Sequence, residues 1–376
     1  MQFSFSDEQE QFRTGLRRFL NEKSPPSEIR RLMATDTGYD RDAWKQLNTS
    51  LGLTAVQIPE AYGGQGFGFV ELAIVLEEMG RALLCAPYFS TAVLAANAIL
   101  NAGTEDQKQA LLPGIAAGDI VATLAFTEDN GRWDSSGVAL TAAEQGGGHR
   151  LNGVKSFVLD GHTADLIIVL ARSPGSAGDE GLSFFIVDGK AQGLERRLLK
   201  SVDQTRKLAR LTFDSVPAEL LGEAGAAAAP LARTLDQAAV CLANEMVGGA
   251  EHMRQSALDY VMMRMQFGRP IASFQAVKHK CADMLVEVEL AKSAAYYAAE
   301  AAAEEDAELP AIASLAKACA SDAFIQTAKE TIQLHGGIGF TWDNDTHLWF
   351  KRAKSSEVFL GTPVYHRELL MQRWNV

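Results

Sequence analysis

The sequence predicts a mainly helical α+β protein in which a small antiparallel β domain lies between an N-terminal helical bundle and a C-terminal four-helix bundle. Apolar residues recur at helical spacing over residues 1–120, give way to short apolar runs over 121–225, and return to helical spacing over 226–376. These three stretches are the predicted domains.

The N-terminal domain is predicted to begin with a helix capped by Ser6, because acidic residues follow this N-cap candidate and Phe12 and Leu16 continue at helical spacing. Pro59 and several glycines interrupt the pattern over residues 59–66. Further helices are expected over residues 70–84 and 90–101.

The middle domain is predicted to be a small antiparallel barrel or sheet. Short apolar runs bounded by Gly, Asp, Asn and Ser predict strands at 121–126, 166–170, 182–187 and 209–213. Glycine-rich stretches at 146–148 and 174–178 predict turns between them.

The C-terminal domain returns to long helical patterns after a hinge at 225–230. Residues 235–265 are long enough for a helix of about eight turns. A second helix is predicted over 314–334, and it ends at Gly336 and Gly337, a common composition for a helix C-terminus.

Composition limits the classes of function. The chain has 376 residues and a formal net charge of −12, which argues against nucleic acid or an anionic membrane as a partner. No stretch reaches the roughly 20 apolar residues of a transmembrane helix, and the N-terminus does not resemble a secretory signal. The cysteines are far apart, so we expect reduced thiols, no metal site and a cytoplasmic protein: Cys85, Cys241, Cys281, Cys319.

Two motifs near the C-terminus indicate a bulky cofactor. The first runs from Arg264 to Ile271 and continues with Phe274 and Gln275, so that a helix end offers a cation for a pyrophosphate and an aromatic ring for stacking. The second, residues 333–340, joins a side-chain amide to glycines that allow close approach of the backbone. Their order and separation are more specific than either motif alone.

Together these motifs resemble the C-terminal flavin-binding signature of the acyl-CoA dehydrogenase family. The resemblance spans the whole chain, because four further blocks resemble family motifs: Pro59–Gly64, Glu77–Gly80, Phe126–Glu128 and the Asn-Gly-x-Lys turn at Asn152–Lys155. It implies FAD-dependent α,β-dehydrogenation of an acyl-CoA thioester, with electrons passing to an electron-transfer flavoprotein. It also implies a dimer at least, and usually a tetramer.

The resemblance assigns the cofactor-binding residues by motif. Residues of the β domain would meet the isoalloxazine ring, and the C-terminal motifs would contact the adenine-diphosphate part across a subunit interface. The residues so assigned are Phe126, Thr127, Phe157, Arg264, Gln266, Phe267, Gln275, Gln333, Gly336, Gly337 and Thr362. Leu159 departs from the family, since it cannot donate the hydrogen bond expected of a threonine there.

The catalytic base is absent from both positions that the family commonly uses. Leu360 occupies the first, in Phe359–Thr362, and Ala238 occupies the second. Glu245 follows Ala238 by about two helical turns, on roughly the same face. This pattern resembles a branch of the family that includes bacterial steroid side-chain dehydrogenases, some built from two different subunits, and the resemblance implies a glutamate on this helix as the base.

We therefore expect Glu245 to remove the α proton, and the alternative is a buried acid paired to an arginine or a helix end. Gly248 and Gly249 leave room for a flat ligand or for another helix, and with the branch resemblance they favour a bulky or branched acyl chain. Glu357 is expected on a solvated helix surface. Two other functions stay open: a non-catalytic or partner-dependent subunit of a heterotetramer, and an oxidase on the same fold.

Overall fold

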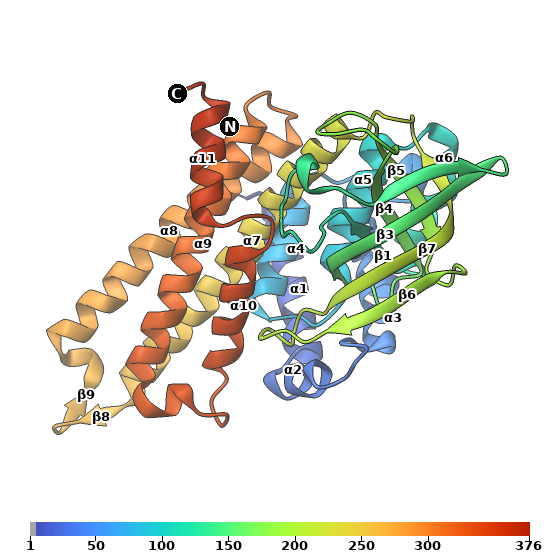
Figure 1. The fold of residues 1–376 in the computed structure, drawn as a ribbon. Coiled ribbons are helices and arrows are strands. Elements are labelled where there is room, and N and C mark those ends of the chain that lie inside the picture. The colour runs from blue at the N-terminus through green and yellow to red at the C-terminus, as the bar shows by residue number, and fades with distance from the viewer. Residues whose placement is uncertain (1–4) are drawn as a thin grey trace. The chain divides into compact units, whose positions relative to one another are not determined.

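The computed structural model describes residues 5–376, drawn as a ribbon in Figure 1. The described chain divides into two compact units. Unit 1 contains residues up to Arg30, Phe69–Leu84 and Ala239–Val376, and unit 2 contains Arg31–Gly68 and Cys85–Ala238. Each unit therefore combines segments that are distant in the sequence.

Unit 2 is built around one mixed sheet with the strand order β1-β4-β2-β3-β7-β5. β6 also pairs with β7, and β5 pairs with both β4 and β7, so the sheet curls back on itself. The strands are β1 (Ala122–Ala125), β2 (Thr141–Gln145), β3 (Gly148–Leu159), β4 (Leu166–Arg172), β5 (Leu182–Asp188), β6 (Leu194–Leu199) and β7 (Leu208–Leu221).

Most neighbouring strands run antiparallel, as predicted, but β1 pairs with β4 in parallel, with Thr123 opposite Ile167. The predicted turn at Gly146 and Gly147 joins β2 to β3. The Asn152–Lys155 segment lies inside β3 and is not a turn, because Gly153 with φ +136° lets the strand pass a register shift against β7.

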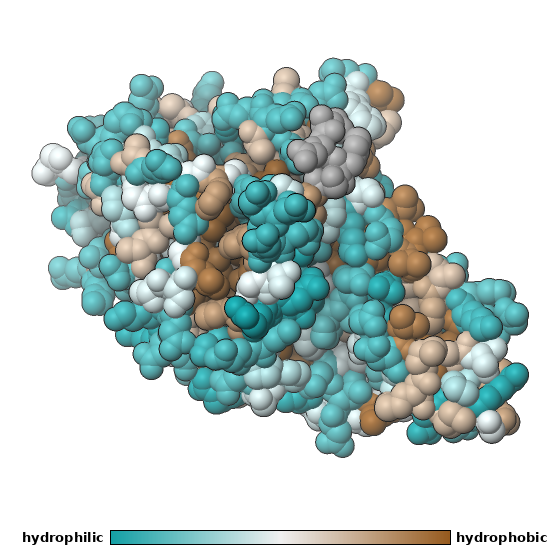
Figure 2. Space-filling view, turned by 180° about the vertical axis from the view of Figure 1, so that it is seen from behind, coloured by the Kyte–Doolittle hydropathy of each residue, from teal (hydrophilic) through white to brown (hydrophobic). Residues whose placement is uncertain are grey.

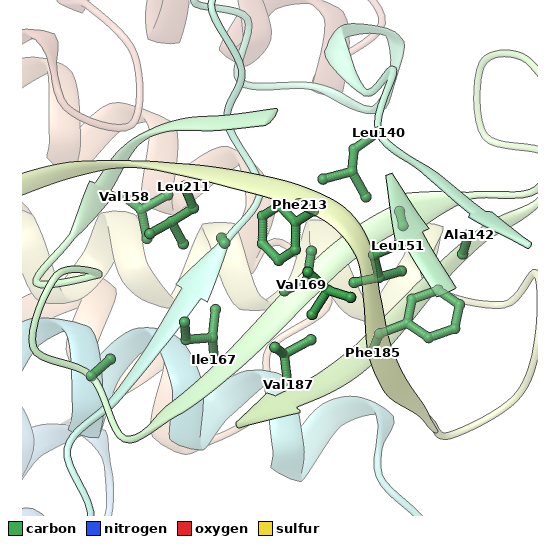
Figure 3. Close-up of a cluster of buried hydrophobic side chains, with 14 of the residues drawn as sticks. Leu140, Ala142, Leu151, Val158, Ile167, Val169, Phe185, Val187, Leu211 and Phe213 are labelled. Carbon is green, nitrogen blue, oxygen red and sulfur yellow. The ribbon is translucent and has the colours of Figure 1, made fainter. Parts of the chain in front are cut away.

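The core of the sheet is the cluster of apolar side chains in Figure 3. Phe213 of β7, Val169 of β4 and Leu151 of β3 point into the same space, and Phe185 and Val187 enter it from β5. Burial of this apolar surface is the main stabilising contribution to the sheet.

Helices complete unit 2. Its helices include α3 (Arg41–Leu51), α5 (Ala96–Ala102) and α6 (Glu105–Ala116), and a π-helix, η3 (Phe89–Ala95), leads into α5. The helix predicted over 90–101 is therefore part π and part α. Thr91 of η3 donates to the carbonyl of Ala122 at 3.1 Å and accepts from its amide at 3.1 Å, which ties η3 to β1.

Unit 1 is helical. It contains α1 (Asp7–Lys23), α4 (Phe69–Arg81), α7 (Ala228–Met263) from Ala239 onward, α8 (Gln275–Ala303), α9 (Leu309–His335), α10 (Thr346–Val358) and α11 (Pro363–Arg373). α9 packs against α8, α10 and α11, and α4 packs against α1 and α8. A two-stranded hairpin, β8 (Met265–Gln266) and β9 (Arg269–Pro270), follows α7.

The remaining elements are short. They are α2 (Pro26–Met33), η1 (Leu53–Ala55), η2 (Glu60–Tyr62), η4 (Ser135–Gly137), η5 (Ile271–Ser273) and η6 (Gly336–Phe340). The predicted cap at Ser6 is present, since its hydroxyl accepts from the amide of Gln9 at 3.2 Å and the Gln9 side chain accepts from the amide of Ser6. Gly336 caps α9 with φ +64°.

Candidate active site

Glu245 is a buried acid on α7, and within unit 1 it is paired to an arginine. Its side chain is 6% exposed and Arg352 of α10 is 5% exposed. The Arg352 Nη1 donates to Glu245 Oε1 at 2.7 Å. This contact is the arginine pairing that the sequence left open as the alternative to catalysis, and Arg352 was not foreseen.

The negative charge of Glu245 also acts on a neighbour one turn away. Burial, and next the charge of Glu245, raise the pKa of the Cys241 thiol well above its usual range. Cys241 is therefore a neutral, buried thiol. It packs as a small apolar residue and is no nucleophile.

The backbone around Glu245 is fixed by a close crossing of α4 and α7. A Cβ added at Gly80 would lie 1.9 Å from the carbonyl oxygen of Glu245, and one added at Gly248 would lie 1.8 Å from that of Glu77. A Cβ at Gly249 would lie 2.5 Å from the ring of Phe324. The space beside Gly248 and Gly249 is thus filled by α4 and by a ring of α9. These glycines accommodate another helix, and they no longer indicate room for a bulky acyl chain.

The segment where the sequence resemblance predicts the common base position, Phe359–Thr362, is held by two buried side chains. Leu360 is buried with φ +62°, and its carbonyl oxygen lies 2.9 Å from His366 Nε2. The ammonium of Lys317 donates to the carbonyls of Ser356 at 3.1 Å and Gly361 at 3.0 Å, at the end of α10. Since an ammonium favours a helix C-terminus, Lys317 stabilises this turn.

The contacts of two other polar residues near this segment are local. Glu357 pairs with the exposed Lys354 on α10, which agrees with the surface position expected for it. Thr362, assigned to the cofactor by motif, is exposed and caps α11 by accepting from the amide of Tyr365 at 3.3 Å.

The two C-terminal motifs lie side by side in unit 1, because the ends of α7 and α9 are packed together. The rings of Tyr260 and His335 stack with centroids 4.2 Å apart, and Thr331 of α9 donates to the carbonyl of Met253 of α7 at 3.0 Å. His335 is therefore a packed residue. The assigned residues of both motifs are exposed here: Arg264, Gln266, Phe267, Gln275, Gln333, Gly336 and Gly337.

The chemistry of this exposed set fits the adenine-diphosphate part of FAD. Phe267 is 91% exposed with φ +53° at the tip of the β8–β9 hairpin, and its ring meets Phe274 edge-on at 6.0 Å. A Cβ added at Gly336 or Gly337 would meet no atom within 4 Å, so both glycines present open backbone. Arg264 adds a cation for a pyrophosphate.

The ring-facing residues assigned by motif come together in unit 2. Thr127 donates its hydroxyl to the carbonyl of Ser156 at 2.6 Å, and the amide of Ser156 donates to Thr127 at 2.9 Å. Phe126 is buried beside Trp133, whereas Phe157 is 45% exposed with φ +59° at the register shift of β3. One exposed aromatic ring, that of Phe157, therefore lies next to the residues that contact the loop after β1.

Two charged residues of this region, Lys155 and Glu128, were missed by the sequence interpretation. Lys155 is fully buried and donates to Glu128 Oε1 at 2.8 Å. A lysine inside a strand whose neighbours alternate in polarity is ordinarily solvated, so no signal in the sequence marked it as buried.

Over 5–376, no group of three or more His, Cys, Asp or Glu side chains is placed to hold a metal ion. No helix in the same range is long and apolar enough to cross a membrane.

The chain belongs to the acyl-CoA dehydrogenase family, because three family models together match almost all of it. The N-terminal domain model matches residues 6–119, the middle domain model 123–216 and the C-terminal domain model 228–374. The family consists of FAD-dependent oxidoreductases that dehydrogenate acyl-CoA thioesters, which confirms the predicted fold and enzyme class.

Individual relatives are similar over nearly their whole length. Acyl-CoA dehydrogenase IpdE2 of Mycobacterium tuberculosis is 33% identical over 364 residues, covering 97% of this chain and 95% of the relative. A variant of the Tcur3481-Tcur3483 steroid ACAD is 32% identical with a TM-score of 0.87, covering 98% of each chain. The butyryl-CoA dehydrogenase of Megasphaera elsdenii is 28% identical with a TM-score of 0.93, covering 100% of both.

Proposed function

We propose that this chain binds FAD and catalyses α,β-dehydrogenation of an acyl-CoA thioester, with Glu245 accepting the α proton. The observation that carries the proposal is a carboxylate buried on α7, the helix on which the sequence resemblance predicts the base. The α C–H bond of a thioester is weakly acidic, so proton removal needs a carboxylate that is fixed and shielded from water. FAD, when bound, supplies the acceptor for the β hydride.

Arg352 sets the condition under which Glu245 can act. The guanidinium donates to the carboxylate at 2.7 Å. A proton accepted by Glu245 would weaken this charged hydrogen bond, so proton transfer has to overcome it. Arg352 in turn orients the carboxylate and compensates its charge while no substrate is bound. The pair therefore holds the carboxylate in a fixed position in the interior of unit 1.

The test is anaerobic reduction of the purified chain by acyl-CoA, followed through the visible flavin band. Wild type is expected to purify yellow and to bleach. Glu245→Gln should retain the flavin but bleach about a hundredfold to ten-thousandfold more slowly, the usual contribution of a general base. Glu357→Gln is the matched control, because it neutralises an acid of α10 that pairs on the surface, and it should bleach at the wild-type rate.

Each other outcome identifies a different function. If Glu245→Gln bleaches as fast as wild type, Glu245 is a structural acid. If wild type is colourless or does not bleach with any thioester, the chain is a non-catalytic or partner-dependent subunit of a heteromeric enzyme. Turnover driven by oxygen alone would indicate an oxidase.

The partner-dependent subunit is the second candidate, and two observations favour it. Leu360 cannot accept a proton at the common base position, although its backbone turn is fully formed. Glu245 is neutralised by Arg352. Purification with a homologous partner subunit, and bleaching only in that complex, would select this candidate.

We further propose a bulky or ring-bearing acyl group as the substrate. The support comes only from the similarity to a steroid ACAD. Gly248 and Gly249 add no support, because the space beside them is filled by neighbouring helices. The bleaching assay should therefore be run with straight short-chain, branched and ring-bearing thioesters. Faster reduction by butyryl-CoA than by the ring-bearing thioesters would reject this proposal.

We also propose that the chain forms an oligomer through the helices of unit 1. An electron-transfer flavoprotein would accept the electrons from FAD. Figure 2 shows apolar side chains on the surface of the helical bundle. Leu285, Val286 and Leu290 are exposed on α8, and exposed patches of this kind mark association surfaces. A tetramer in light scattering, lost in Leu290→Glu, is the expected result, and a wild-type monomer would reject it.

A further inference from the structure

A buried ion pair in unit 2 connects the segments that carry the ring-facing residues. Lys155 of β3 has 0% of its surface exposed, and its ammonium donates to Glu128 Oε1 at 2.8 Å and to the carbonyl of Phe126 at 3.2 Å. Glu128 in turn accepts from the amides of Ala139 at 2.9 Å and Leu140 at 3.0 Å. One ion pair therefore joins β3, the loop after β1 and the entry to β2.

The same loop is joined to β3 a second time, one residue further along β3. Thr127 and Ser156 exchange a hydroxyl–carbonyl and an amide–carbonyl hydrogen bond. Phe157 follows at φ +59°, a conformation that costs free energy in a residue with a Cβ and that persists only where neighbours impose it. The contacts of Lys155 and Ser156 are the neighbouring constraints on this turn.

We propose that Lys155 is a positioning residue for the ring of the cofactor: its pair with Glu128 holds Phe126 and Thr127 in register with Phe157. The inference rests on the proposed function, because it requires that FAD binds. Lys155 would act through the loop and through the turn at Phe157, and it is not itself a catalytic residue.

The electrostatics of the pair agree with this role. Burial lowers the pKa of Lys155 to about 8, while the charge and hydrogen bond of Glu128 oppose that shift and Arg172 adds to it. A buried ammonium that needs a carboxylate to stay charged makes its loop dependent on that carboxylate. Removing either partner leaves the other charge uncompensated and releases the loop.

The experiment compares FAD binding by apoproteins of wild type, Lys155→Met and Glu128→Gln. Arg196→Met is the matched control, since it removes a cation from the same sheet that donates to the carbonyl of Ala164 at 2.8 Å, away from this loop. Dissociation constants are measured for FAD by fluorescence quenching and for ADP by displacement of FAD. ADP carries the adenine and the pyrophosphate but no ring. Near-ultraviolet circular dichroism reports whether unit 2 is folded.

We expect Lys155→Met to weaken FAD binding about tenfold or more, which corresponds to about 1.4 kcal/mol. The dissociation constant for ADP should change less than about twofold, and the resolved shoulders of the flavin band should be lost. A general structural defect would weaken FAD and ADP equally. Glu128→Gln, which keeps an acceptor for the loop amides, should weaken FAD binding in the same direction, and Arg196→Met should leave it unchanged.

Binding of FAD by Lys155→Met within about twofold of wild type, with an unaltered band, overturns the inference and leaves the proposed function standing. Wild-type apoprotein that takes up no FAD overturns both. If Lys155→Met does not fold, Glu128→Gln decides the matter: equal loss of FAD and ADP binding overturns the inference, and selective loss of FAD binding supports it.

Discussion

The Glu245–Arg352 pair allows a quantitative prediction, because both side chains are almost completely buried. The perturbation is a double-mutant cycle of Glu245→Gln, Arg352→Met and the two together. Each single variant removes one partner of an ion pair 2.7 Å long and leaves the other in the interior of unit 1. Removing one partner of a buried pair costs about 3–5 kcal/mol of unfolding free energy.

The double variant should be less destabilised than the sum of the single variants. It contains no uncompensated charge, and its main cost is burial of the uncharged amide introduced by the Glu245→Gln change, about 1–3 kcal/mol. The interaction free energy of the cycle is therefore expected to exceed about 2 kcal/mol. The exposed pair of Lys354 and Glu357 on α10 is the control, and its cycle should give at most about 1 kcal/mol.

The assay is denaturant unfolding at fixed concentrations of protein and FAD, followed by tryptophan fluorescence. Trp349 is a suitable probe, since it is buried on α10 and its ring stacks on His252 with centroids 4.0 Å apart. Free energies of Glu245→Gln and Arg352→Met that add within about 0.5 kcal/mol would refute the reasoning, because uncoupled residues behave in that way.

Two further predictions concern packing and acid stability. Gly248→Ala should lower the unfolding free energy by at least about 1–3 kcal/mol, because its Cβ would lie 1.8 Å from the carbonyl oxygen of Glu77. The control is Gly15→Ala on α1, where an added Cβ would meet no atom within 4 Å, and it should be neutral or stabilising by up to about 1 kcal/mol in the same denaturant unfolding assay. Burial lowers the pKa of His366 from 6.5 to about 3. The contribution of the neutral imidazole to the unfolding free energy is therefore complete above pH 6.5 and is lost as the pH falls toward 3, a change of about 5 kcal/mol. His366→Gln should therefore lose less stability than wild type over that pH window, and an equal loss in acid titrations of both proteins would contradict this assignment.

The helices were predictable from the sequence because their patterns are long. The helix expected over 314–334 is α9, and the one over 235–265 is α7, which starts earlier because Ala228–Pro230 can also be helical. β3 was not predicted, since Gly148–Leu159 contains no long apolar run. It becomes a strand through its pairing with β7, a contact between distant residues that local patterns do not report.

The candidate site was predictable only in part, for the same physical reason. An acid in an apolar helix is visible in the sequence, so Glu245 could be selected as a candidate, and its catalytic role stays a prediction. Its partner Arg352 lies 107 residues further along the chain and on another helix. Lys155 and Glu128 were missed because charged residues are ordinarily solvated. What sets these charged residues apart from solvated ones is an ion pair formed inside the fold, and residue type alone does not reveal such a pair.

Backbone strain occurs at three positions in segments that the sequence resemblance assigns to the site. Phe157, Phe267 and Leu360 all have positive φ, and they lie in β3, in the turn of the β8–β9 hairpin and in the turn after α10. Such conformations persist where neighbouring groups impose them, and at Leu360 those groups are Lys317 and His366. This turn carries Leu360, and so no carboxylate, at the position where the sequence resemblance predicts a base. If this chain is active alone, the proton must be taken elsewhere, and the buried carboxylate of Glu245 is the candidate that α7 offers in unit 1.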